Sequence, residues 1–177
     1  LIRYLVLPLF LLSPGSVLGH PPVKVGIIMG LTGPLAQTAG EMRRGIELAL
    51  SEPGAVPITV LYEDDKGFES KEAVLAAQRL INQSKVQILI NWGTTTTPAV
   101  APLANKYRTP LVVMWDSNRA ILEAGQYVFC SGASTERAGA LAARFAVGEL
   151  KKKRLAILAL NDAWSELIAK SFALTAG

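Results

Sequence analysis

Residues 86–114 read VQILINWGTTTTPAVAPLANKYRTPLVVM, and this stretch decides the fold. Val86–Ile90 is a short apolar run rich in Val and Ile, which predicts a buried strand. Pro98–Tyr107 is long enough for a helix, and Leu111–Met114 repeats the strand pattern. A strand, a helix and a second strand in this order predict a parallel sheet with helices packed against it.

The same alternation extends in both directions from this stretch. A capping box, Thr38-Ala39-Gly40-Glu41, predicts the start of the first helix. The fold class is therefore α/β with a doubly wound parallel sheet, and such sheets bind ligands beyond the carboxyl ends of their strands. The other strands are predicted at Val23–Met29, Ile58–Tyr62, Tyr127–Cys130 and Leu155–Leu160, and the other helices at Ser70–Asn82, Arg119–Glu123, Glu136–Leu150 and Ala163–Ala173.

The composition excludes several functional classes. Half of the 177 residues are hydrophobic and 18% are charged, which predicts a packed globular core. The net charge of +4 comes largely from residues 151–154, Lys-Lys-Lys-Arg, which we interpret as a solvated helix C-terminus. Nucleic-acid binding is not expected, because no basic face with interleaved aromatics is visible. The single cysteine, Cys130, and the single histidine, His20, exclude an internal disulfide and a zinc site built from spaced Cys and His ligands.

The N-terminus has the pattern of a secretory signal peptide. Arg3 precedes the apolar stretch Tyr4–Leu12, and small residues lead to a cleavage site after Gly19. Residues 1–19 are therefore expected to direct the chain to the periplasm or another extracytoplasmic compartment. The alternative is an ordinary buried strand or helix, which Pro8 and Pro14 disfavour.

The loop after the third strand, Trp92 to Pro98, is the most informative. Thr97 is predicted to cap the helix and Pro98 to occupy its first position. Gly93 would let a ligand approach the backbone, and hydroxyl and N–H groups would meet at the positive helix end. This predicts a site for a carboxylate, or, as the alternative, four threonines that only cap a helix and fill a loop.

Two other loops carry candidate ligand contacts. After the fourth strand, Asp116 or Ser117 could cap the short helix, and Ser117 could also donate to a ligand. After the sixth strand, Trp164 could close over a ligand, or it could simply pack. The loop at residues 30–34 lacks both the G-x-G-x-x-G spacing and the phosphate-loop lysine, so no nucleotide or other cofactor is expected.

Several of these segments resemble the branched-chain amino-acid (Leu/Ile/Val) binding proteins, which have the periplasmic binding protein type I fold. The resemblance extends from about Val23 to the C-terminus, and the order and spacing of its motifs are more specific than any one of them. The motifs are Gly30-Leu31-Thr32-Gly33-Pro34-Leu35-Ala36 with Gly40 and Gly45, Tyr62-Glu63-Asp64-Asp65, Ala99-Val100-Ala101-Pro102-Leu103-Ala104, and Thr109-Pro110-Leu111.

The resemblance implies two lobes joined by a hinge, with a small-molecule ligand between them and the permease of an ABC importer as partner. Residues 23–132 would form a complete first lobe, and residues 133–177 the beginning of an incomplete second lobe. Such a chain is expected to be truncated and to bind ligand weakly or not at all, because closure needs both lobes.

The resemblance also implies roles for individual residues. Gly93 and Thr94 would meet the ligand carboxylate, and the Trp115 carbonyl and Ser117 would meet its amine. Thr135 would add a contact just past the hinge, and Trp164 would flank the ligand from the second lobe. The bulk of Trp115 and the charges of Asp116 and Arg119 depart from the family pattern, so a branched aliphatic ligand does not follow.

The leading hypothesis is a solute-binding protein that captures an amino acid or similar small carboxylate. A ligand-sensing receptor domain of the same fold and a truncated product without binding activity are the alternatives. An enzyme is not expected, because the sequence has neither a usable histidine beside a nucleophile nor a cofactor loop.

Overall fold

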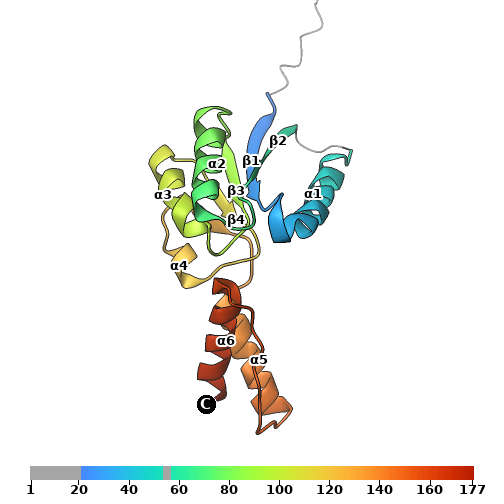
Figure 1. Ribbon diagram of the computed structural model, residues 1–177, viewed down its shortest axis with the longest axis vertical. Helices are drawn as coiled ribbons and strands as arrows, with labels where there is room; N and C mark the ends of the chain where they lie inside the picture. Colours follow the sequence, from blue (N-terminus) through green and yellow to red (C-terminus); the bar gives the residue numbers. More distant parts are fainter. Residues whose placement is uncertain (1–20, 54–56) are drawn as a thin grey trace, which may run out of the picture.

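The computed structural model describes residues 21–53 and 57–177 (Figure 1). The predicted signal peptide, residues 1–19, lies outside this range. One part of the described chain is a sheet flanked by helices, and the other is a pair of helices that extends from it. None of the helices in these ranges is long and apolar enough to cross a membrane.

The sheet has five strands, and all of its neighbouring strands run parallel. Its spatial order is β2-β1-β3-β4-β5, so the chain crosses over between β2 and β3. The doubly wound parallel sheet predicted from the sequence is confirmed. The strand bounds are β1 Val23–Met29, β2 Ile58–Asp64, β3 Ile88–Asn91, β4 Leu111–Val113 and β5 Val128–Cys130.

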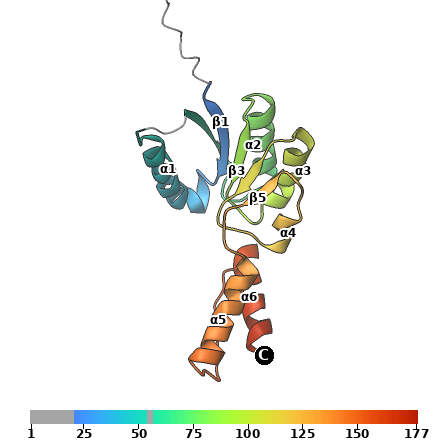
Figure 2. The same cartoon turned by 180° about the vertical axis from the view of Figure 1, so that it is seen from behind.

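Helices cover both faces of the sheet, as Figures 1 and 2 show. On one face lie α2 (Ser70–Asn82), α3 (Thr97–Tyr107) and the short α4 (Arg119–Leu122), and on the other lies α1 (Ala36–Leu50). The strands alternate between the two cores, since Ile28 packs with α2 and α3, whereas its neighbours in β1 face the opposite side.

Close packing of α2 on the sheet depends on a glycine in β1. A Cβ atom built on Gly26 would lie 2.8 Å from the Cδ1 atom of Leu80 in α2. Leu80 itself is buried, together with Ala73, Ala76 and Ala77 on the same helix face. Small residues on α2 and a glycine in β1 therefore let the helix approach the strand backbone closely.

The first helix begins earlier than the capping box predicts. A 3₁₀ turn at Gly33–Leu35 leads directly into α1 at Ala36, and Leu35 at the N-cap position makes no side-chain cap. Thr38 lies inside the helix. The prediction is wrong because the turn that contains Pro34 already has helical geometry, so the helix is nucleated before Thr38 is reached.

The chain leaves the sheet after β5 and forms α5 (Thr135–Arg144), which continues as a π-helical turn at Phe145–Glu149. The basic run at 151–154 lies just beyond this turn and is exposed. A second helix, α6 (Ala163–Ala176), packs against α5, and the Ser171 hydroxyl donates to the Glu136 carbonyl at 2.5 Å.

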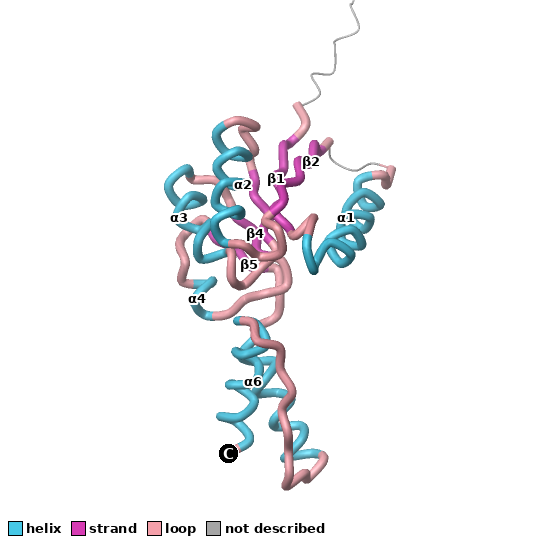
Figure 3. Tube along the Cα trace, in the orientation of Figure 1, coloured by secondary structure: helices cyan, strands magenta, loops and turns pink. Residues whose placement is uncertain are grey.

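The predicted sixth strand is not formed. Leu155–Leu160 is extended but has no strand neighbour, and Figure 3 shows it as loop beside the two helices. All six of its residues are exposed, and Leu158 is fully so. A strand requires a partner for its N–H and C=O groups, and no other strand lies in this part of the described chain.

Candidate ligand-binding site

A cavity of about 440 Å³ lies at the carboxyl edge of the sheet. Loops that follow four parallel strands contribute to it, and the start of α6 closes one side. This edge is where open parallel sheets bind ligands. The cavity is lined by Pro34, Leu35, Gly67, Phe68, Trp92, Gly93, Thr94, Thr95, Met114, Trp115, Asp116, Asp162 and Trp164.

The loop after β3 is held by a buried asparagine. The Asn91 side-chain amide donates to the hydroxyls of Thr96 and Thr97, at 3.0 and 2.9 Å. The Thr97 hydroxyl in turn donates to the Gly93 carbonyl. The predicted Thr97 cap is therefore wrong, because Thr97 is the first helical residue and Thr96, at the N-cap position, makes no side-chain cap. Both hydroxyls shape the loop and are buried away from the cavity.

Gly93 is required by both conformation and space. Its φ of 151° is one that residues with a side chain rarely adopt. A Cβ atom at this position would lie 2.8 Å from the Phe68 ring and from the Thr96 hydroxyl. The backbone of this loop therefore forms the cavity wall directly.

Thr94 and Thr95 complete the loop and line the cavity. Within the described residues, their backbone N–H groups have no hydrogen-bond partner. They lie just before α3, where the aligned peptide dipoles give a partial positive charge. Two free N–H groups at this position can hold an anionic group.

Asp116 joins three segments at the base of the site. Its buried carboxylate accepts hydrogen bonds from the hydroxyls of Thr94 and Thr135 and from the backbone and side-chain amides of Asn118, the last two at 3.2 and 2.9 Å. These contacts tie the loops after β3 and β4 to the first residue of α5. Asn118, rather than Asp116 or Ser117, caps α4 by accepting from the Ile121 N–H at 3.0 Å, so that prediction is wrong.

Aromatic rings form much of the wall. Phe68 and Trp92 meet edge to face with 5.1 Å between ring centroids, and Trp92 and Trp115 do the same at 5.9 Å. Trp164 lines the cavity from the start of α6. The three tryptophans of the chain thus all lie at this one site. Such walls suit a ligand with an apolar body.

The comparisons with known proteins agree with this geometry. A family model described as periplasmic binding protein matches residues 22–177. The chain belongs to this family. Its sheet and flanking helices are those of the type I fold, as the resemblance predicted, and the family is one of solute-binding proteins rather than enzymes.

Similar periplasmic binding proteins are known from several bacteria. The Leu/Ile/Val-binding protein homolog 6 of Brucella abortus (strain 2308) is 27% identical over 141 residues, which cover 77% of this chain and 36% of that protein. A solute binding protein of an ABC transporter from Rhodopseudomonas palustris HaA2, solved with p-hydroxybenzoic acid, is 26% identical with a TM-score of 0.77. The match covers 88% of this chain and 44% of that one.

A leucine binding protein from Thermotoga maritima MSB8 has the same TM-score of 0.77 at 24% identity, with 87% of this chain and 45% of that chain covered. At this identity the likeness shows the fold alone. The matched regions thus make up 36% to 45% of the length of these three relatives.

The structure brings four of the six predicted ligand-binding residues of this periplasmic binding protein to the cavity. These are Gly93, Thr94, Trp115 and Trp164. The other two do not line it. Ser117 is buried and is not among the lining residues, and the Thr135 hydroxyl donates to Asp116. Contact of all six with a ligand stays a prediction.

Sequence reasoning did not identify Phe68 as a cavity residue. The signal that could have found it is the turn at residues 66–68, which follows β2 at the carboxyl edge of the sheet. Asp65, which is buried, holds this turn, since its Oδ1 atom accepts from the N–H groups of Gly67 and Phe68, both at 3.1 Å. Its other oxygen has no partner in the described chain, and burial raises the pKa of this carboxyl.

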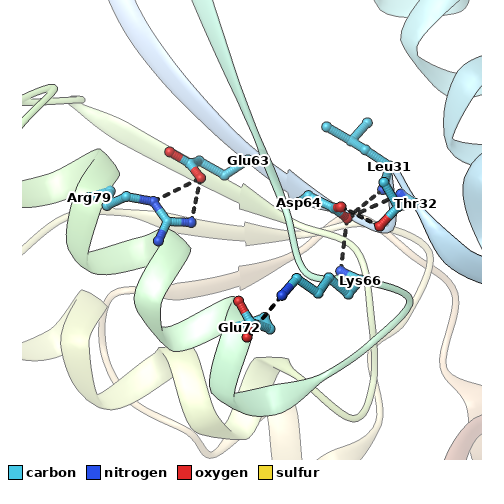
Figure 4. Close-up of polar contacts among 7 residues, drawn as sticks. All are labelled: Leu31, Thr32, Glu63, Asp64, Lys66, Glu72 and Arg79. Carbon is cyan, nitrogen blue, oxygen red and sulfur yellow. Dashed lines mark hydrogen bonds and ion pairs between the residues drawn. The ribbon is translucent and has the colours of Figure 1, made fainter.

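Asp64 connects the β2 turn to the loop after β1 (Figure 4). Its Oδ1 atom accepts from the N–H groups of Leu31, Thr32 and Lys66 at 2.9, 3.2 and 2.8 Å, and the Thr32 hydroxyl donates to Oδ2. Burial opposes ionisation of Asp64, but the hydrogen bonds from Thr32 and the backbone outweigh it and lower its pKa. This carboxylate therefore positions the loop that brings Pro34 and Leu35 to the cavity.

Two ion pairs lie beside this turn. The Arg79 guanidinium donates to Glu63 at 2.6 and 3.0 Å, and the Lys66 ammonium lies 3.3 Å from Glu72 (Figure 4). Neither pair lines the cavity. They secure β2 and its turn to α2 from the outside.

Proposed function

We propose that the chain serves in an extracytoplasmic solute-binding protein that captures an amino acid or a similar small carboxylate for an ABC importer. The observation that carries this proposal is the cavity at the carboxyl edge of the sheet, which is lined by Thr94 and Thr95, two residues whose N–H groups have no hydrogen-bond partner in the described chain. Membership of the periplasmic binding protein family supports the solute-binding role and the compartment. The importer permease is the partner that this role requires.

The loop after β3 is the proposed carboxylate site. Gly93 brings the backbone to the cavity wall, and the N–H groups of Thr94 and Thr95 precede the positive end of α3. Backbone donors at a helix N-terminus bind carboxylates without any cationic side chain. The Thr94 hydroxyl is already donated to Asp116, so it would offer a lone pair rather than a proton to the ligand.

The relatives supply the second support. One is named for leucine, isoleucine and valine, and another was solved with p-hydroxybenzoic acid. Both kinds of molecule join a carboxylate to an apolar body. The aromatic wall and the free N–H groups of this chain match these two parts. We further propose that residues 23–132 form the first lobe of the binding protein and that residues 133–177 begin the second.

Tryptophan fluorescence tests the proposal, because every tryptophan of the chain lines the cavity. Titration with leucine, isoleucine and p-hydroxybenzoate up to millimolar concentrations should change the emission saturably. The matched amides, leucinamide and p-hydroxybenzamide, keep the apolar body but lack the carboxylate, so they should bind at least about tenfold more weakly. Equal binding of acid and amide would contradict the proposal. No saturable change with any ligand would also contradict it and would favour the alternative, a product without binding activity.

A further inference from the structure

We propose that the cavity selects zwitterions whose cationic pole is an alkylated ammonium group, in preference to simple carboxylates. This inference rests on the proposed function, because it names the solute class of the same site. It starts from the charges around the cavity. Asp116 and Asp162 are both in the lining, whereas none of the lining residues described is a lysine, arginine or histidine.

The negative charge of Asp116 is not balanced by a cation. Asp116 is 3% exposed, and the four groups that donate hydrogen bonds to its carboxylate, two hydroxyls and two amides, are all neutral. Across the described parts of the chain, none of the ion pairs includes it. A buried anion without a counter-ion sets up a negative potential that is weakly screened by solvent. A cationic group in the adjacent cavity would be attracted to it.

Asp116 acts on this cationic group mainly through its electrostatic field. Four donors already fill the lone pairs of Asp116, and the oxygens of Asp162 accept from the N–H and hydroxyl of Ser165 at 2.8 and 3.0 Å. A primary ammonium brings three donors that each need an acceptor, and the buried carboxylate of Asp116 has no lone pair left for them. An alkylated ammonium makes fewer such demands and is bound by charge and by aromatic faces.

The aromatic residues supply those faces. Trp92 and Trp115 lie nearly perpendicular, with 74° between their ring planes, and so form a corner of the wall. Trp92 is buried and fixed, whereas Trp115 and Trp164 are 62% and 48% exposed. Exposed indole rings around a negatively charged cavity are the arrangement that binds methylated ammonium groups.

One pair of probes isolates the charge. Glycine betaine and 3,3-dimethylbutanoate have the same shape and the same carboxylate, but only the betaine carries a positive nitrogen. Titration of the full chain, followed by tryptophan emission, should show about tenfold tighter binding of the betaine. Glycine, which has the primary ammonium, should bind more weakly than the betaine. Equal or tighter binding of 3,3-dimethylbutanoate would overturn the inference.

Variants at one exposed ring test the aromatic contribution. Trp164→Leu should reduce the preference for the betaine over its carbon isostere severalfold, and Trp164→Phe should keep most of it. Tyr107→Leu changes an exposed aromatic on α3 that does not line the cavity, so the preference should stay unchanged. Thermal unfolding checks that each variant folds. An unchanged preference in folded Trp164→Leu would count against the inference.

The two proposals fail in different ways. If neither betaine nor any carboxylate changes the emission, the solute-binding function fails and the inference fails with it. If leucine, p-hydroxybenzoate or 3,3-dimethylbutanoate binds as well as the betaine, the solute-binding function stands and only the inference fails.

Discussion

The sheet region, residues 23–130, and the helical pair that follows it differ sharply in their interiors. Of the hydrophobic residues that are fully buried in the described chain, all but Ala143 lie in the sheet region. The helix α6 buries none of its residues. Both regions are rich in apolar side chains, so composition alone does not produce a core. A core requires elements on both sides of each apolar face.

The contrast is clearest between two short apolar segments. Leu111–Val113 pairs with β3 on one side and with β5 on the other. Its first and last residues, Leu111 and Val113, are buried. Leu155–Leu160 is at least as apolar, yet it has no neighbouring strand and is exposed. The difference shows that pairing and packing, rather than the pattern of the segment itself, decide whether a strand forms.

The largest expected effect on stability is the difference between two leucine-to-alanine substitutions, one in each region. Leu89→Ala removes a fully buried side chain of β3 and should lower the free energy of unfolding by about 3 kcal/mol. Leu158→Ala alters a fully exposed side chain and should change it by less than about 0.5 kcal/mol. Urea unfolding monitored by circular dichroism measures both. Similar losses for the two variants would show that residues 155–160 are packed after all.

A smaller effect is expected where the two regions meet. Asp116→Ala leaves the buried hydroxyl of Thr135 and the amide of Asn118 without their acceptor, and should cost about 2 kcal/mol. Because Thr135 begins α5, hydrogen exchange should also become faster at the start of this helix.

Asp162→Ala is the matched control for this change. It removes only the N-cap of α6 and should cost about 1 kcal/mol, with no change in exchange at the start of α5. Unaltered exchange at Thr135 and its neighbours in Asp116→Ala would show that Asp116 does not connect the regions.

The smallest expected effect is a dependence of stability on pH that arises from one carboxyl group in the sheet region, Asp65. Burial raises the pKa of Asp65, so this carboxyl favours folding while it is protonated. Its contribution to the free energy of unfolding is complete below the pKa of about 4 that it has in the unfolded chain. The contribution is lost as the pH rises through the raised pKa of the folded state. An asparagine amide does not ionise in this range. The free energy of unfolding of Asp65→Asn should therefore fall less steeply than that of the unmodified chain as the pH rises above about 4.

The measurement is urea unfolding at a series of pH values from 3 to 7, with Asp162→Asn as the control in the other region. Asp65→Asn keeps an oxygen to accept from the N–H groups of Gly67 and Phe68, so the turn should persist. If its pH profile matches that of the unmodified chain, Asp65 is not a source of the dependence.

Much of the fold could be predicted from the sequence, because strand and helix patterns are local. The five strands that form lie close to their predicted positions, and the cavity lies at the carboxyl edge where their loops meet. Four of the six candidate residues reach it. Thr135 does not, since a buried acceptor, Asp116, takes its hydroxyl, and no local pattern reveals an acceptor 19 residues away.

The sequence by itself determined the alternation of strands and helices, the parallel sheet and the loops that carry the site. Only the tertiary structure decided that Asn91 and Asp116 organise those loops, that Phe68 joins the wall, and that residues 155–160 form no strand. The physical reason is that periodicity and turn chemistry act over a few residues. Hydrogen-bond partners, strand neighbours and burial depend on segments that only folding brings together.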